Sequence, residues 1–214
     1  MAGKFYELKI TLMECHVEVT RTFVVPSDLR LDYLHQIVQE VMGWRFSHLH
    51  EFQAGNKRYG DKSYDDADED VCDEKRVRLS AIAKPGKPCF GYIYDFGDEW
   101  VHRVEVIDFD YAGLPPRRSL YCLEAKGACP PEDVGGVYGY EDFCRAINDK
   151  KNPEHEEMLE WVYGLYPRDK TWPDGVSVEG INGFLKGCEN GLKKIAAAKK
   201  PKPRKVWMYV GPGK

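Results

Sequence analysis

The sequence predicts a single α+β domain in which a mainly antiparallel sheet packs against helices. Two stretches, near the start and between residues 89 and 109, alternate apolar and polar residues with the period of two that a half-buried strand requires. Between them, the segment Leu31–Met42 changes to the spacing of an amphipathic helix. The 214 residues are 43% hydrophobic and 13% aromatic, which suffices for one core without disulfides.

The opening of the chain, residues 5–42, is expected to fold as strand, strand, helix. Residues 5–14 and 17–25 read as two strands, and Pro26 ends the second. Apolar residues at positions 31, 34, 37, 38, 41 and 42 place one face of the next segment in the core. Gly43 is a natural C-terminal stop for this helix.

Two short strands are expected next, at residues 48–53 and 57–59, around a turn at Gly55 and Asn56. Residues 61–74 hold eight acidic residues. Acidic runs repel one another and stay hydrated, so we expect a solvated loop here. The segment lacks the spacing of a calcium-binding EF-hand loop.

A hairpin is expected from residues 89–96 and 99–109, with Gly97 and Asp98 as a two-residue turn. Cross-strand partners share a face of a sheet. This turn therefore predicts that Asp95, Trp100 and His102 lie on one face. Tyr92, Tyr94 and Phe96 are then expected on the opposite, core face.

The remaining elements are expected to be a strand at residues 119–124 and helices at 140–148, 152–161 and 177–198. Asn152 and Pro153 have the pattern of an N-cap followed by the first helical residue. We place the domain at residues 5–185, and a helical extension with a basic tail at 186–214.

The net charge of −4 hides an uneven distribution. Residues 190–214 hold eight Lys or Arg and no acidic residue, which leaves a net charge of −12 on residues 1–189. An acidic body is a poor surface for nucleic acid, so phosphate contacts are expected only from the tail. The candidate nucleic-acid-binding residues are Lys199, Lys200, Lys202, Arg204 and Lys205.

The chain has an odd number of cysteines, seven, and no CxxC motif, which argues against a disulfide framework and against a zinc ribbon. No run of 18 apolar residues is present, and the N-terminus lacks the apolar stretch of a signal peptide. We therefore expect a cytoplasmic protein with no membrane partner.

Five segments together resemble one family. In order they are LH (34–35), MGWRFSHLHEF (42–52), YIYDFGDEWVHRVEV (92–106), CPPEDVGGVYGYEDF (129–143) and NPEHEEMLEWV (152–162). Their order and spacing are similar to those of the plasmid pRiA4b ORF-3-like proteins, over residues 5–185. The resemblance implies a roll-like α+β domain in a cytoplasmic protein, encoded near plasmid or transposon genes. It implies no established activity. The acidic insert and the basic tail depart from the family pattern.

Polar residues recur in three of these segments, where hydrophobic packing does not require them. Burying such groups unpaired costs roughly 1–3 kcal/mol each, so we expect the segments to converge, either as a site or as a structural network. The candidate cluster is His48, His50, Asp95, Asp98, Trp100, His102, Glu132 and Asp133.

His48 and His50 have the i, i+2 spacing that places two rings on one face of a strand, and His102 is a candidate third ligand. A divalent metal is therefore a candidate cofactor, although none is established. The alternative, purely structural interpretation is that these histidines only form hydrogen bonds within the sheet.

Three functions remain open. We favour a non-enzymatic binding or interaction module, because no complete catalytic motif is present. The alternatives are a metal-dependent hydrolase or nuclease that uses the candidate cluster, and a nucleic-acid-associated protein that acts through its tail. The sequence identifies neither a substrate nor a partner.

Overall fold

A computed structural model describes residues 4–63 and 69–198, and these residues form a single α+β domain, as the sequence predicts. Their strands make one eight-stranded sheet in the order β5-β4-β3-β6-β7-β1-β2-β8. Neighbouring strands are antiparallel, except for β4 and β5, which run parallel. None of the helices in the described residues is long and apolar enough to cross a membrane.

The elements follow one another along the chain without internal repetition. They are β1 (Phe5–Leu12), β2 (Thr20–Pro26), α1 (Leu31–Met42), β3 (His50–Ala54), β4 (Lys57–Gly60), β5 (Val71–Asp73), the 3₁₀ helix η1 (Glu74–Arg76), α2 (Leu79–Ile82), β6 (Cys89–Tyr94), β7 (Trp100–Asp108), β8 (Tyr121–Lys126), α3 (Gly136–Asn148), α4 (His155–Leu165) and α5 (Val178–Ala198).

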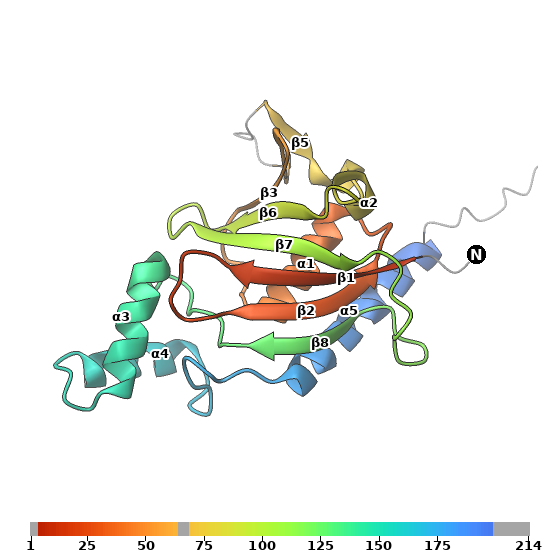
Figure 1. The fold of residues 1–214 in the computed structure, drawn as a ribbon. Coiled ribbons are helices and arrows are strands. Elements are labelled where there is room, and N and C mark those ends of the chain that lie inside the picture. The colour runs from red at the N-terminus through yellow and green to blue at the C-terminus, as the bar shows by residue number, and fades with distance from the viewer. Residues whose placement is uncertain (1–3, 64–68, 199–214) are drawn as a thin grey trace, which may run out of the picture.

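The core lies between the sheet and the helices α1 and α5, which Figure 1 shows behind the strands. Alternate residues of β1 and the apolar stripe of α1 are buried there, with Leu8, Ile10, Leu34 and Val38 fully enclosed. Each such side chain contributes about 1.5–3 kcal/mol. Helices α3 and α4 lie beyond one end of the sheet (Figure 1).

Helix α1 begins and ends where the sequence predicts. Gly43 follows it with φ +101°, and its N–H donates to the carbonyl of Gln39. This left-handed residue turns the chain sharply, so that Trp44 enters the core with 4% of its surface exposed. The segment after Gly43 then runs along the end of the sheet.

The hairpin register predicted from the sequence is wrong. The loop between β6 and β7 comprises residues 95–99, closed by the N–H of Glu99 to the carbonyl of Asp95. Tyr94 therefore pairs with Trp100, and Tyr92 pairs with His102. An odd number of loop residues inverts the facing of one strand, so Trp100 and His102 lie on the core face with the tyrosines.

The acidic segment is only partly the loop that its composition predicts. Residues 71–73 form strand β5, parallel to β4, and Glu74 after it is buried. Residues 64–68 lie outside the described part of the chain. The charge pattern of the acidic segment does not indicate that residues 71–73 add a strand to the sheet.

Two helices begin elsewhere than predicted. Helix α3 begins at Gly136, four residues earlier, and α4 begins at His155 rather than after Asn152. The side chain of Asn152 accepts a hydrogen bond from the N–H of Glu154, so it caps a turn that precedes the helix.

The boundary predicted at Leu185 falls inside α5. Glu189, beyond that boundary, is 3% exposed and accepts hydrogen bonds from the backbone N–H groups of Ser119 and Leu120. It also pairs with Arg118 at 3.2 Å. The candidate nucleic-acid-binding residues at 199–205 lie outside the described residues.

Candidate functional site

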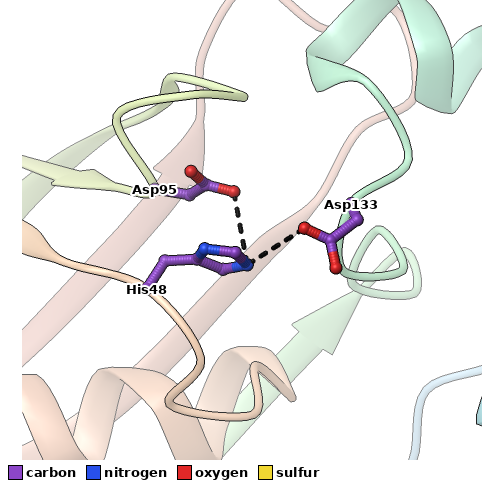
Figure 2. Close-up of side chains that lie close together, drawn as sticks. All are labelled: His48, Asp95 and Asp133. Carbon is purple, nitrogen blue, oxygen red and sulfur yellow. Dashed lines mark ion pairs between the residues drawn. The ribbon is translucent and has the colours of Figure 1, made fainter.

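Three loops meet at one end of the sheet and bring polar side chains together. They are the segment after α1, the loop between β6 and β7, and the loop that leads into α3. Figure 2 shows His48, Asp95 and Asp133, one from each loop, with both carboxylates turned towards the imidazole. The predicted convergence of the three sequence segments therefore occurs.

His48 is the centre of this cluster. Its Nε2 atom lies 3.5 Å from Oδ2 of Asp95, 3.6 Å from Oε2 of Glu132 and 3.2 Å from Oδ1 of Asp133. One ligand atom each from His48, Asp95 and Asp133 lie within 4.8 Å of one another. The cluster runs from the interior to the surface, because the side chain of Glu132 is 5% exposed and that of Asp133 is 73% exposed.

In each of the two buried carboxylates, Glu132 and Asp95, the oxygen farther from His48 accepts hydrogen bonds. Oε1 of Glu132 accepts from the N–H of Arg45 at 2.7 Å and from the hydroxyl of Tyr94 at 3.0 Å. Oδ1 of Asp95 accepts from the N–H of Gly97 at 2.9 Å. The remaining oxygens, Oε2 and Oδ2, are thereby turned towards His48.

Two atoms of the cluster are buried without a hydrogen-bond partner in the described residues. They are Nε2 of His48 and Oε2 of Glu132. Burial raises the pKa of Glu132, while the Arg45 N–H and the Tyr94 hydroxyl act in the opposite direction. A buried polar atom without a partner costs free energy, which a ligand bound between these atoms would recover.

The backbone at the cluster is in an unusual conformation. Asp95 and Asp133 have φ values of +57° and +59°, in the left-handed region that few non-glycine residues adopt. The N–H of Gly135 donates to Oδ2 of Asp98 at 3.1 Å. Gly136, at φ +70°, lies so close to the carbonyl of Asp98 that a Cβ atom there would be 2.8 Å from it. These contacts clamp the loop of Asp133 onto the loop of Asp95.

The three histidines predicted as metal ligands are not brought together. Strand β3 begins only at His50, so the i, i+2 geometry of a strand does not apply to His48. His50 instead contacts Oε2 of Glu74 at 2.7 Å. His102 is 1% exposed in the core, where its Nδ1 lies 3.3 Å from the carbonyl of Tyr92. Among the candidates, only His48 remains beside carboxylates that could share an ion.

Two other candidates have supporting positions. Asp98 connects its loop to Gly135, as described above. Trp100 is fully buried, and its ring lies 5.3 Å from that of Trp44. Sequence reasoning missed Tyr94, because its hydroxyl reaches the cluster from a strand position that only suggests core packing.

A family model for plasmid pRiA4b ORF-3-like proteins matches residues 4–173. The chain belongs to this family. Within it, the chain is similar to the uncharacterized protein y4hQ of Sinorhizobium fredii (strain NBRC 101917 / NGR234). The two are 40% identical over 164 residues, which are 75% of this chain and 82% of the relative.

The fold also recurs in a solved structure. A crystal structure of a protein of unknown function, MM3350 from Methanosarcina mazei Go1, superposes with a TM-score of 0.71 at 27% identity. The match covers 82% of this chain and 96% of the other. These relatives establish the pRiA4b ORF-3-like fold and leave the function to be argued from the site.

Proposed function

We propose that this pRiA4b ORF-3-like protein is a binding module that holds a divalent metal ion with His48, Asp95 and Asp133. The observation that carries the proposal is the imidazole nitrogen of His48. It is buried without a hydrogen bond, yet three carboxylate oxygens face it within 3.6 Å.

The spacing of the donor atoms supports this assignment. Ligand atoms about 2.0–2.1 Å from a tetrahedral ion lie roughly 3.3 Å apart. The separations of Nε2 of His48 from the oxygens of Asp133 and Asp95 are 3.2 and 3.5 Å. A set of one imidazole and carboxylate oxygens suits a first-row divalent metal such as Zn²⁺ or Mn²⁺.

Glu132 supports the site without joining the three ligands. Its Oε2 faces His48, and its own hydrogen bonds fix its position. In this place it can accept a hydrogen bond from a water molecule on the ion. Outer-shell partners of this kind typically change metal affinity 10- to 100-fold when they are removed.

Calorimetric titration of EDTA-treated protein with Zn²⁺ and with Mn²⁺ tests the proposal. We expect saturable binding of one ion per chain, and at least a roughly 10-fold loss of affinity in His48→Ala and in Asp133→Asn. The controls are His16→Ala and Asp142→Asn, which change an exposed histidine and an exposed aspartate outside the cluster. If the cluster variants bind as tightly as the wild type, the proposal is wrong.

A second candidate function is a metal-dependent hydrolase, favoured by the position of His48 on the wall of a pocket of about 1080 Å³. Catalytic metal ions keep one position open to water or substrate, and the pocket would give access to it. Metal-loaded protein is then expected to hydrolyse chromogenic esters or amides, and His48→Ala is expected not to. Equal rates in both proteins would exclude this function.

The acidic residues that line the pocket argue against a nuclease, whose substrate is an anion. The cytoplasmic location, the association with mobile-element genes and the binding of nucleic acid through the tail stay predictions.

A further inference from the structure

The pocket beside the metal cluster has chemistry of its own. It lies between α1, the segment that joins α1 to β3, the β4–β5 edge and the loop between β6 and β7. Its volume of about 1080 Å³ is at the upper end of the range of small-molecule sites. Asp133, the exposed member of the metal cluster, is not among the residues that line it.

Two stacked histidines form part of the wall. The rings of His35 and His50 lie 3.4 Å apart with an angle of 3° between their planes. The His50 ring is held by Glu74. Two protonated rings in this contact would repel each other, so the stack requires that at least one ring is neutral.

His35 lies at the end of a chain of hydrogen bonds. The oxygen of the Gln39 amide accepts from the N–H of Phe46 at 2.9 Å, so its nitrogen donates to the hydroxyl of Tyr92 at 3.1 Å. That hydroxyl lies 2.8 Å from Nδ1 of His35. In its neutral form, His35 can accept a hydrogen bond from this hydroxyl at Nδ1. Burial, followed by the proximity of His50, lowers the pKa of His35 to about 2.

Carboxylates outnumber cations around the pocket. Two basic residues, Arg58 and Lys75, line it. Arg58 pairs with Glu51, Lys75 with Asp61 and Arg30 with Asp32. The formal charges of the Lys, Arg, Asp and Glu side chains sum to 3 − 5 = −2, and the excess comes from Glu74, which contacts His50, and from Glu99. The acidic residues of the lining are Asp32, Glu51, Asp61, Glu74 and Glu99.

Exposed apolar side chains gather at the same place. Phe46, Leu49 and Phe96 line the pocket and are 47%, 47% and 55% exposed. They are three of the seven large hydrophobic residues that are exposed in the described part of the chain. Phe46 has φ +58°, an outlier for a bulky residue, and its N–H is fixed by Gln39. The ring is thus held at the surface by the surrounding structure.

We propose that this pocket binds an organic cation, an ammonium group on an apolar chain. The net negative charge of the lining, with Glu99 beside Phe96, attracts the charge. The aromatic rings of Phe46 and Phe96 suit both a cation and the apolar chain that carries it. The neutral His35 adds a hydrogen-bonding group without adding positive charge. An anion of the same shape would be repelled by the acidic lining. The proposal does not depend on the metal ion.

Three ligands of equal length and different charge test the proposal. Pentylammonium, 1-pentanol and pentanoate are titrated into the EDTA-treated full-length chain at low salt, and binding is followed by NMR shifts of the Phe46, Phe96 and His35 rings. We expect pentylammonium to bind at least 10-fold more tightly than pentanol, and pentanoate to bind more weakly than pentanol. Equal affinities for the three ligands, or no shifts at these rings, would overturn the proposal.

Substitutions of exposed residues test the site without destabilising the fold. Phe96→Ala and Glu99→Gln are expected to weaken pentylammonium binding at least 3-fold. Phe184→Ala and Glu156→Gln, which change exposed residues of the same types on other elements, are expected to have no effect. If the pocket variants bind the ammonium like the wild type, the site is not this pocket.

The test also separates this inference from the proposed metal function. Asp133→Asn removes a metal ligand outside the pocket, so it is expected to lose metal affinity and to keep its affinity for pentylammonium. Loss of both in this variant would contradict an independent cation site. Spermidine and a lysine-containing tripeptide amide then distinguish a free polyamine from a lysine side chain as the source of the ammonium group. Binding of either ligand more tightly than pentylammonium supports the assignment.

Discussion

His102 shows how burial controls the protonation of a single residue. It is enclosed in the core, with Nδ1 towards the carbonyl of Tyr92 and Nε2 without a partner in the described residues. The indole N–H groups of Trp44 and Trp100 beside it also lack partners there. An ordered water molecule between the two indoles and the imidazole would satisfy these atoms.

The stability of the protein is expected to fall on acidification because of His102. Burial lowers its pKa from 6.5 to about 4. Between these values the unfolded chain binds a proton that the folded chain does not, so stability is lost as the pH falls from 6.5 to 4. The loss is about 3 kcal/mol from this residue.

Urea denaturation at several pH values measures this effect. His102→Gln is expected to be less stable at pH 7 but to depend less on pH between 6.5 and 4. His16→Gln, at an exposed position, is expected to keep the wild-type slope. An unchanged slope in His102→Gln would show that another group causes the acid sensitivity.

Arg21 is a second residue whose role the sequence conceals. In β2 it shares a face of the strand with the apolar Phe23 and Val25, and it is 1% exposed. Its guanidinium donates to the carbonyls of Val41 and Met42 at the end of α1, and to that of Lys126 in β8. It therefore joins the helix to the sheet edge.

Removal of this guanidinium is expected to destabilise the fold strongly. Arg21→Met keeps an apolar chain of similar length but leaves the buried carbonyls without donors, which costs roughly 3 kcal/mol. Arg103→Met, at an exposed position of β7, is the matched control and is expected to cost under about 1 kcal/mol. Similar losses in the two variants, measured by denaturation, would contradict this role.

At the scale of elements, periodic sequence patterns predict helices and strands well, whereas the conformations of loops are predicted poorly. The period of α1 gives both its ends, and β1, β6 and β7 lie within one to two residues of their expected ends. The loop at residues 95–99 was mispredicted because Gly97 and Asp98 match a short turn in sequence. Tertiary contacts decide between the two-residue turn and the five-residue loop, because only the five-residue loop places Trp100 on the buried face of the sheet.

A contact between two loops holds Asp133 beside His48 and Asp95, the three proposed metal ligands. Gly136 lets the loop of Asp133 approach Asp98, and a side chain there would both clash with the Asp98 carbonyl and be strained at φ +70°. Gly136→Ala is expected to lower metal affinity at least 10-fold, although it changes no ligand.

The control for this prediction is Gly164→Ala in α4, where a Cβ atom meets nothing within 4 Å. It is expected to leave metal affinity unchanged and to stabilise the helix slightly, because alanine is the better helix former. Equal metal affinities in Gly136→Ala and the wild type, measured by calorimetry, would mean that the loop contact does not position Asp133.

For the whole molecule, the sequence predicted the convergence of three segments more reliably than the roles within them. Polar residues in otherwise apolar motifs indicated that the segments meet, and they do. The sequence did not indicate that His50 would pair with Glu74, because that contact depends on the acidic segment returning to the sheet as β5. The stacking of His35 was missed for a similar reason, because its position in helix α1 does not indicate that its ring will contact His50 on strand β3.

The metal ion at His48 is the central claim, and crystals of the protein grown with Zn²⁺ test it most directly. Diffraction data collected at the zinc absorption edge are expected to show an anomalous peak about 2.0–2.2 Å from Nε2 of His48 and from one oxygen each of Asp95 and Asp133. A structure that binds zinc only elsewhere, with no peak between these three side chains, would contradict the account.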